Sequence, residues 1–278
     1  MNDSISIIGG DVRNIELAKI LQEEYKEKYT VNTYALEKSQ NTLKEVIEKS
    51  NFIITSVPLS KDKINLYTPY SDEKISLEKL FSMIKNKTVI TANISEEYEK
   101  ILQQNNNKIV DLLKCDDYAI LNAEPTSEGA IQIAMENTTK TLQYSNVLVI
   151  GYGKIGKILT KQLKAFDANV YCTARKDADF ATMYINGIKK LEYENLSKEI
   201  SKFDIIFNTV PSIILRKEEL EKIKNDAVII ELASKPGGID LEESKNYNFK
   251  IINAQGLPGK VAPKTAAQII EKTLKKYL

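Results

Sequence analysis

The stretch Val147-Leu148-Val149-Ile150-Gly151-Tyr152-Gly153-Lys154-Ile155-Gly156 joins a short apolar run to the spacing G-x-G-x-x-G. A helix-like segment at 157–166 follows, and a second strand-like run lies at 169–173. In this context the first glycine makes a tight turn, the second lets backbone approach a pyrophosphate and the third permits close helix packing. The helix N-terminus adds amides without partners and partial positive charge. The stretch predicts a dinucleotide-binding Rossmann domain, with a purely structural glycine turn as the alternative.

The end of the second strand distinguishes NADP from NAD. An NAD enzyme usually places Asp or Glu there, roughly 20 residues past the glycines. This chain has Tyr171-Cys172-Thr173-Ala174-Arg175-Lys176 and no acid before Asp177. Adjacent cations favour a 2′-phosphate, so we expect NADP; the alternative is that Arg175 stacks on adenine and NAD is accepted too. The expected cofactor-binding residues are Gly151, Gly153, Lys154, Ile155, Gly156, Thr173, Ala174, Arg175, Lys176, Thr209, Val210, Pro211, Ala233 and Ser234.

Strand-like and helix-like segments alternate along the whole chain. The strand-like runs lie at 4–8, 30–34, 52–56, 88–92, 109–113, 147–150, 169–173, 204–208, 227–231 and 249–252. This alternation is typical of parallel sheets built from βαβ units. The segment 5–11 also echoes 147–153. We therefore expect an α/β protein with two doubly wound parallel-sheet domains, flavodoxin-like and Rossmann, and a cleft between them.

The expected domain limits follow from this pattern and from the chain length. The substrate or catalytic domain is expected at 1–140 and the dinucleotide-binding domain at 141–262. Pro263 suits the first position of a helix, and we expect the helix 263–278 to cross back and complete the first domain.

Composition excludes several classes of site. The 278 residues include no histidine and only two cysteines, Cys115 and Cys172, so Ser-His-Asp or Cys-His catalysis is absent and no metal site is expected. A net charge of +1 gives no case for nucleic-acid binding. The N-terminus does not resemble a signal peptide, and no apolar run approaches the roughly 18 residues of a membrane span. We expect a cytoplasmic protein with no nucleic-acid or membrane partner.

The first domain lacks the nucleotide fingerprint. Asp11 occupies the position that corresponds to Gly153, where a carboxylate would repel a pyrophosphate. Asp11 and Arg13 should instead face the crevice at the carboxyl end of a parallel strand. The alternative is that Asp11 is a helix N-cap and Arg13 its surface neighbour.

Three further loops are expected to reach the crevice. Residues 124–129 precede a helix expected at 128–137 and offer two carboxylates, hydroxyls and helix-start amides. Residues 234–238 form a Gly/Pro turn expected near the nicotinamide. The segment 256–265 carries Lys260 and Lys264 at a helix start, a plausible carboxylate clamp, although each lysine is as readily explained as merely solvated.

These segments together resemble the family of the dipicolinate synthase A subunit. The resemblance rests on Ile8-Gly9-Gly10-Asp11 with Arg13, Pro125-Thr126-Ser127-Glu128-Gly129, Asn208-Thr209-Val210-Pro211-Ser212, Leu232-Ala233-Ser234-Lys235-Pro236-Gly237-Gly238 and Gly256-Leu257-Pro258-Gly259-Lys260-Val261-Ala262-Pro263-Lys264-Thr265. It runs over nearly the whole chain in order, although the middle of the first domain, about 61–80, carries no matching motif. The last segment is far more specific than the glycine fingerprint.

The resemblance implies a sporulation enzyme of the mother-cell cytoplasm that works in a complex with the B subunit of dipicolinate synthase. It implies conversion of 4-hydroxytetrahydrodipicolinate to dipicolinate, with loss of water and hydride transfer to NADP. For the dicarboxylate we expect Arg13, Thr126, Ser127, Lys260 and Lys264 as binding residues. Acid–base candidates are Asp11, Glu124, Glu128 and Lys264.

Two other functions stay open at this point, as does homo-oligomerisation. One is an NADP-dependent dehydrogenase of another small amino or hydroxy acid, and the missing histidine counts against the usual mechanism of the hydroxyacid enzymes. The other is an NADP-binding scaffold whose partner carries the chemistry.

Overall fold

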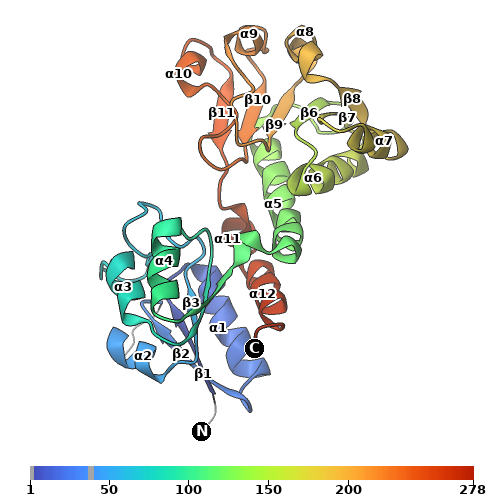
Figure 1. The fold of residues 1–278 in the computed structure, drawn as a ribbon. Coiled ribbons are helices and arrows are strands. Elements are labelled where there is room, and N and C mark those ends of the chain that lie inside the picture. Colours follow the sequence, from blue (N-terminus) through green and yellow to red (C-terminus); the bar gives the residue numbers. More distant parts are fainter. Residues whose placement is uncertain (1–2, 37–40) are drawn as a thin grey trace. The chain divides into compact units, whose positions relative to one another are not determined.

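The computed structural model describes residues 3–36 and 41–278. By internal contacts the chain divides into two compact units (Figure 1). Unit 1 comprises Met1–Asn122 and Pro258–Leu278, and unit 2 comprises Ala123–Leu257. The sequence pattern places the limits at 140 and 262, whereas the compact units meet at 122 and 257.

Unit 1 is built on a parallel sheet of five strands in the order β2-β1-β3-β4-β5. The strands are β1 (Asp3–Ile8), β2 (Tyr29–Tyr34), β3 (Phe52–Thr55), β4 (Thr88–Thr91) and β5 (Lys108–Asp111). Its helices are α1 (Val12–Glu24), α2 (Leu43–Lys49), α3 (Leu77–Met83), α4 (Glu96–Gln104), the 3-10 turn η1 (Leu112–Lys114), most of α11 (Leu257–Val261) and α12 (Pro263–Leu274). The order 2-1-3-4-5 is that of flavodoxin-like folds, as expected.

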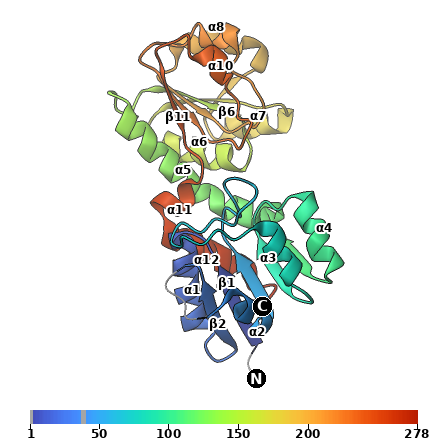
Figure 2. The same cartoon turned by 90° about the vertical axis from the view of Figure 1, so that its left-hand side faces the viewer.

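The C-terminal helix α12 belongs to unit 1, where it lies beside α1 (Figure 2). Leu17 and Leu21 of α1 share a buried cluster with Ala267 and Ile270 of α12. The Tyr25 hydroxyl, just past α1, donates to the Glu271 carboxylate at 2.6 Å. Burying an aliphatic side chain contributes about 1.5–3 kcal/mol to the free energy of unfolding. The packing of α12 on α1 therefore stabilises unit 1 substantially.

Unit 2 carries a parallel sheet of six strands in the order β11-β10-β9-β6-β7-β8. The strands are β6 (Asn146–Ile150), β7 (Asn169–Thr173), β8 (Lys189–Leu191), β9 (Ile205–Asn208), β10 (Val228–Glu231) and β11 (Lys250–Asn253). The helical elements are α6 (Lys154–Ala165), α7 (Asp177–Ile185), η2 (Tyr193–Asn195), α8 (Leu196–Glu199), η3 (Ile200–Lys202), α9 (Lys217–Leu220) and α10 (Leu241–Ser244). Counted from β6, this is the Rossmann order 3-2-1-4-5-6, and the expected fold class is confirmed.

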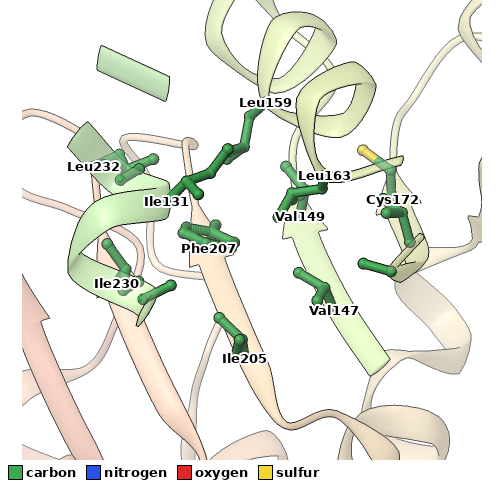
Figure 3. Packing of buried hydrophobic residues seen from close by; sticks show 14 of the residues in the cluster. Ile131, Val147, Val149, Leu159, Leu163, Cys172, Ile205, Phe207, Ile230 and Leu232 are labelled. Carbon is green, nitrogen blue, oxygen red and sulfur yellow. The ribbon is translucent and has the colours of Figure 1, made fainter. Parts of the chain in front are cut away.

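The central strands of the unit 2 sheet are covered on both faces, and β6, β9 and β10 are buried at almost every position. Val147 and Val149 of β6 pack with Leu159 and Leu163 of α6 and with Ile131 (Figure 3). The intervening residues of β6 point into a second cluster on the other face of the sheet. This two-sided burial explains the continuous apolar runs of the sequence.

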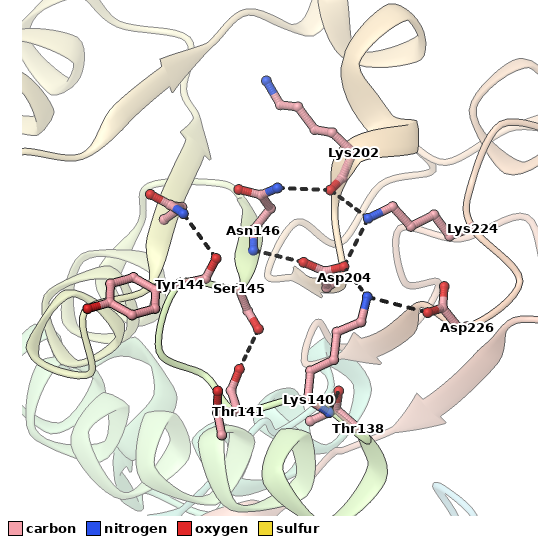
Figure 4. Close-up of polar contacts among 11 residues, drawn as sticks. Thr138, Lys140, Thr141, Tyr144, Ser145, Asn146, Lys202, Asp204, Lys224 and Asp226 are labelled. Carbon is pink, nitrogen blue, oxygen red and sulfur yellow. Dashed lines mark hydrogen bonds and ion pairs between the residues drawn. The ribbon is translucent and has the colours of Figure 1, made fainter.

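A polar network lies at the amino ends of β6 and β9. Asp204 accepts hydrogen bonds from Lys140 (2.7 Å), Lys224 (2.9 Å) and the Asn146 amide (2.9 Å) (Figure 4). Burial raises the pKa of Asp204, but these hydrogen bonds lower it more, and the pKa lies at about 2. The network connects the loop before β6 to the start of β9. It lies at the amino ends of the strands, whereas the glycine-rich turn follows the carboxyl end of β6.

Helix α5 (Asp116–Asn137) corrects one expectation. The sequence predicts a loop at 124–129 before a helix at 128–137, but this segment lies inside the 22-residue helix. Pro125 stands in the helix interior, where its ring removes one N–H donor. The expected helix-start amides at Thr126 and Ser127 are therefore absent.

No helix within 3–36 and 41–278 has the length and apolar character needed to cross a bilayer.

Candidate functional site

The glycine-rich turn after β6 has the geometry that a dinucleotide requires. Gly151 adopts φ +98°, and a Cβ there would lie 2.6 Å from the Thr209 hydroxyl oxygen, so only glycine fits. Its N–H donates to the hydroxyl of buried Thr173 at 2.9 Å, which fixes the turn to the end of β7. The turn thus joins β6, β7 and the loop after β9.

The other two glycines have contrasting surroundings. Gly153 is the N-cap of α6, it has no side chain to cap the helix, and a Cβ there would meet nothing within 4 Å. A Cβ on Gly156 would lie 2.0 Å from the carbonyl oxygen of Gly151. Open space above Gly153 leaves room for a pyrophosphate at the helix N-terminus, and Gly156 allows the helix to pack against the turn.

A cavity of about 810 Å³ opens at this turn. It is lined by Gly151, Tyr152, Gly153, Ala174, Arg175, Lys176, Asp179, Tyr193, Leu196, Thr209, Val210, Pro211, Ser212, Ile213, Ile214, Arg216, Glu218 and Glu219. The volume lies in the range of cofactor sites, about 300–1,000 Å³. Eight of the fourteen expected cofactor residues line it, and the six that do not are Lys154, Ile155, Gly156, Thr173, Ala233 and Ser234.

Three cations line this cavity. Arg175 and Lys176 follow β7, and Arg216 precedes α9. All three are exposed, and none forms an ion pair with any described residue within 4.0 Å. The carboxylate of Asp179, by contrast, is paired with Lys157 at 3.2 Å. Glu218 and Glu219 also line the cavity, beside Arg216, whereas Arg175 and Lys176 form an adjacent pair of cations after β7 that suits a phosphate.

Sequence reasoning missed Arg216, Tyr152 and Asp179 as lining residues. The scarcity of arginine, only three in the chain, was the available signal for Arg216. Asp179 lies in the first turn of α7, six residues after the end of β7, too late to be recognised as a ribose ligand.

A second candidate site lies in unit 1 at the carboxyl ends of β1 and β3, the strands between which the sheet order reverses. Asp11 is the N-cap of α1 and accepts the Arg13 N–H at 3.1 Å. Arg13 donates from Nε (2.9 Å) and Nη2 (2.8 Å) to the two carboxylate oxygens of Asp11, and also to the Val57 carbonyl. The N-cap alternative for Asp11 is thus correct, but Arg13 is no surface neighbour, since it is only 4% exposed.

Tyr118 is a further buried group near this ion pair, and sequence reasoning did not find it. Its side chain is 2% exposed, and burial raises the pKa of Tyr118 to about 12, with Arg13 lowering it and Asp11 raising it. The phenol therefore keeps its proton at neutral pH. Tyr118 lies near the start of α5, where its aromatic ring resembled any other core residue in the sequence.

The segment around Gly259 covers Arg13. A Cβ on Gly259 would lie 2.3 Å from Nε of Arg13, so the backbone of α11 passes directly over the guanidinium. Lys260 follows in the last turn of α11, and Lys264 lies in the first turn of α12 after Pro263. Both lysines are accessible to solvent and form no ion pair with the described residues. Arg13 is thus a buried cation, and Lys260 and Lys264 are solvent-accessible cations on the consecutive helices α11 and α12.

The remaining predicted residues lie on α5 and do not line the cofactor cavity. Glu124 accepts a hydrogen bond from Gln162 of α6 at 2.9 Å, and Glu128 lines a small cavity of about 510 Å³ with the same Gln162. Gln162 is eight residues, about 12 Å, along α6 from Lys154. Ser127 is fully buried and donates to the Ala123 carbonyl at 2.8 Å, and Thr126 is 8% exposed. The cofactor turn and these two carboxylates are therefore separate features of unit 2.

The chemistry of the described residues fits a nucleotide and an anionic substrate. Within 3–36 and 41–278 no three Cys, Asp or Glu side chains converge as a metal site would require. Burial raises the pKa of the Cys172 thiol, so this cysteine beside the glycine turn is an inert core residue.

Comparison with known proteins finds similarity along the whole chain. The family described as the N-terminal domain of the dipicolinate synthase A subunit matches residues 4–113. The family described as D-isomer specific 2-hydroxyacid dehydrogenase, NAD binding domain, matches residues 121–236. The chain is 34% identical to the dipicolinate synthase A subunit of Bacillus subtilis, over 99% of this chain and 95% of that protein.

Two crystal structures have the same fold. The dipicolinate synthase A chain from Bacillus subtilis has a TM-score of 0.88 at 29% identity and is covered to 96%, while 100% of this chain is covered. The dipicolinate synthase A subunit from Bacillus halodurans has a TM-score of 0.89 at 26% identity, with 99% of this chain and 97% of that chain covered. Both units are thus matched together.

Proposed function

The chain belongs to the family of the dipicolinate synthase A subunit, and on this premise we propose that it is the NADP-dependent component that converts 4-hydroxytetrahydrodipicolinate to dipicolinate. It is a nicotinamide-dependent oxidoreductase.

The proposed reaction is balanced by the nicotinamide. The substrate loses its 4-hydroxyl and a neighbouring proton as water, which leaves a dihydropyridine dicarboxylate. A hydride then passes to NADP⁺ and a proton is released, giving NADPH and the aromatic pyridine dicarboxylate. Bound NADP supplies the hydride acceptor, and the protein positions both reactants.

The cationic cavity at the glycine-rich turn is the observation that supports NADP. Arg175 and Lys176 lie at the end of β7, where an NAD enzyme has an acidic residue, and Arg216 lines the same cavity. These three side chains would hold the 2′-phosphate, and the turn at Gly153 would hold the pyrophosphate. Asp179 is engaged by Lys157 and does not replace the acidic ligand of an NAD enzyme.

The ion pair in unit 1 and the two free lysines support a dicarboxylate substrate. We assign Lys260 and Lys264 to the substrate carboxylates, because both are solvent-accessible cations: Lys260 lies on α11, which covers Arg13, and Lys264 lies on the next helix, α12. Arg13 is held by Asp11 and by the Val57 carbonyl, which fixes its direction. Thr126, Ser127, Glu124 and Glu128 stay weaker candidates, since they are buried or engaged within unit 2.

Asp11 is the carboxylate best placed for proton transfer in unit 1. It is partly exposed and lies at a strand end, the usual position of ligands in such sheets. Lys264 is the alternative acid–base group, because it is a free amine in the same unit.

The cellular setting follows from the family. We propose action in the cytoplasm of the mother cell during sporulation, in a complex with the B subunit of dipicolinate synthase. Assays with and without that partner decide which of the two chains carries out the dehydration.

The test supplies 4-hydroxytetrahydrodipicolinate, generated in situ, to the purified chain with NADP⁺, alone and with the B subunit. NADPH absorbance and terbium-sensitised dipicolinate fluorescence are followed together. We expect both signals to rise in a one-to-one ratio. NADPH formed without dipicolinate would contradict the synthase and favour a dehydrogenase of another small acid. Dipicolinate formed at the same rate when NADP⁺ binding to this chain is abolished would favour the scaffold.

A further inference from the structure

Glu231 is a carboxylate that the cofactor cavity and its cations do not include. It is the last residue of β10, at the carboxyl edge of the six-stranded sheet, and it is only 5% exposed. In the sheet register it stands directly opposite Asn208, the last residue of β9. Two polar side chains are thus buried side by side at the carboxyl ends of the strands, the same end at which the glycine-rich turn follows β6.

The Glu231 carboxylate is satisfied by N–H donors alone. Asn208 Nδ2 donates to Oε1 at 2.7 Å, the Ala233 amide donates to Oε1 at 2.9 Å, and the Gly238 amide donates to Oε2 at 2.8 Å. Each partner donates and none accepts, which is the hydrogen-bonding pattern of an ionised carboxyl. Among the described residues no Lys or Arg nitrogen lies within 4.0 Å of it. The site therefore holds a buried negative charge without a counter-cation.

This carboxylate connects two loops. Asn208 also donates to the Val210 carbonyl (2.9 Å) and accepts the Val210 amide (3.2 Å), which folds the loop that lines the cofactor cavity. The amides of Ala233 and Gly238 lie at the two ends of the Gly/Pro turn after β10. The fit is close, because a Cβ on Gly238 would lie 2.3 Å from Asn208 Nδ2. One side chain thus sets the shape of both loops.

The strand order places these loops under the nicotinamide half of the cofactor. A dinucleotide lies across the point where the order reverses, with one mononucleotide on each half of the sheet. Arg175 and Lys176, two of the cations assigned to the 2′-phosphate, follow β7 on one side of β6, and β9 and β10 are the next strands on the other side. The nicotinamide therefore belongs over β9 and β10, where Glu231 is buried.

We propose that Glu231 is a positioning residue that holds both loops, and that its uncompensated charge makes the site prefer the oxidised, positively charged nicotinamide over the reduced, neutral one. This rests on the proposed NADP function. An opposite charge nearby in a poorly solvated site stabilises a cation, and NADPH carries none on its ring. The preference would favour loading with NADP⁺ and release of NADPH.

The test measures nucleotide binding to the purified full chain without substrate. Dissociation constants for NADP⁺ and NADPH are determined by calorimetry and by NADPH fluorescence for wild type, Glu231→Gln and Glu242→Gln. Glu242 is the matched control, since it lies in the same unit but is exposed on α10 and paired with Lys245. Glu231→Gln should weaken binding of NADP⁺ more than binding of NADPH. We expect the dissociation constant of NADP⁺ divided by that of NADPH to rise on the order of tenfold. The control should keep the wild-type ratio.

Two further variants separate shape from charge. Glu231→Asp keeps the charge but shortens the reach, and Gly238→Ala pushes against Asn208 without changing the charge. Both should weaken NADP⁺ and NADPH by similar factors and leave the ratio near that of wild type. These variants keep the proposal testable if Glu231→Gln fails to fold, because a changed ratio in folded Glu231→Asp would overturn the charge argument.

The outcomes distinguish this inference from the proposed function. An unchanged ratio in folded Glu231→Gln would refute the role of the charge, even if the chain makes dipicolinate. A shifted ratio in a chain that makes no dipicolinate would support the inference and overturn the synthase. Unaltered affinity for both nucleotides in Glu231→Asp and Gly238→Ala would refute the positioning role.

Discussion

A Cβ on Gly156 would lie 2.0 Å from the carbonyl oxygen of Gly151, so helix α6 and the cofactor turn touch backbone to backbone. Gly153, three residues earlier, has open space above it. Gly156→Ala should therefore lower the free energy of unfolding by about 1–3 kcal/mol, as overpacking does. Gly153→Ala should cost about 0.5–1 kcal/mol and mainly weaken nucleotide binding. Denaturant unfolding and NADP titration of both variants check this pair, and equal stability losses would contradict it.

Removal of the Arg175 guanidinium should weaken NADP much more than NAD. A hydrogen bond to a charged group contributes about 1.5–3 kcal/mol, so Arg175→Ala should raise the NADP dissociation constant about 10–100-fold. The NAD value should change less than about threefold if the contact is to the 2′-phosphate. Titration with both nucleotides is the measurement, and equal losses would refute the phosphate assignment.

Arg216 offers a second test of the same phosphate site. It lines the cavity from the α9 side and forms no ion pair with the described residues. Arg216→Ala should raise the NADP dissociation constant by about three- to tenfold, a smaller loss because the side chain is exposed. Lys217→Ala, next along the chain but outside the cavity lining, is the control. Indistinguishable titrations of these two variants would remove Arg216 from the site.

The ion pair of Asp11 with Arg13 should contribute to stability in a way that only a double variant reveals. Arg13→Met leaves the Asp11 carboxylate without its partner and should lower the free energy of unfolding by about 2–4 kcal/mol. Adding Asp11→Asn should recover part of that loss, since the remaining charge is gone. Denaturant unfolding of the single and double variants measures the coupling. Strictly additive losses would mean that the two side chains do not stabilise each other.

Lys264 is expected to act on the substrate rather than on the fold. Lys264→Ala should raise KM for the dicarboxylate about tenfold and leave the unfolding free energy within about 0.5 kcal/mol of wild type. Lys272→Ala removes the same charge in the last turn of α12 and serves as the control. A fall in kcat at constant KM would instead assign Lys264 to proton transfer.

Stability should depend on pH through Asp204. Its folded pKa of about 2 lies below the unfolded value of about 3.9, so its stabilisation is fully present above pH 4 and is lost as the pH falls through 2. Asp204→Asn should therefore cost about 1–2 kcal/mol at pH 7 and about half of that at pH 3. Urea unfolding at both pH values tests this. The control is Asp226→Asn, an exposed member of the same network, for which about 0.5 kcal/mol or less is expected.

Most of the sheet architecture could be predicted from the sequence, because buried parallel strands are continuous β-branched runs. All ten expected strands exist among the described residues, within one or two residues at each end. Strand β8 was missed, since Lys189-Lys190-Leu191 is a short edge strand with no apolar run. The pattern reports burial on both faces, and an edge strand lacks it.

The candidate site was harder to predict because local signals have several meanings. Residues 124–129 were expected as a loop before a helix, although α5 already begins at Asp116. Asp11 and Arg13 were recognised as special, but their mutual ion pair depends on a side-chain geometry that spacing alone does not fix. Glu231 appeared only as the end of an apolar run, and its importance comes from Asn208 in the neighbouring strand.

Because α12 belongs to unit 1, the two units can complete their folding in a defined order during synthesis. Unit 2 is one uninterrupted stretch, Ala123–Leu257, whereas unit 1 needs Pro258–Leu278 to complete its core. Domains fold as units while the ribosome elongates the chain. The nucleotide-binding unit can therefore finish folding first. Until α12 is synthesised, the apolar surface of α1 with Leu17 and Leu21 stays exposed to solvent. A growing chain is thus exposed to aggregation through its earliest segment until its last helix has emerged.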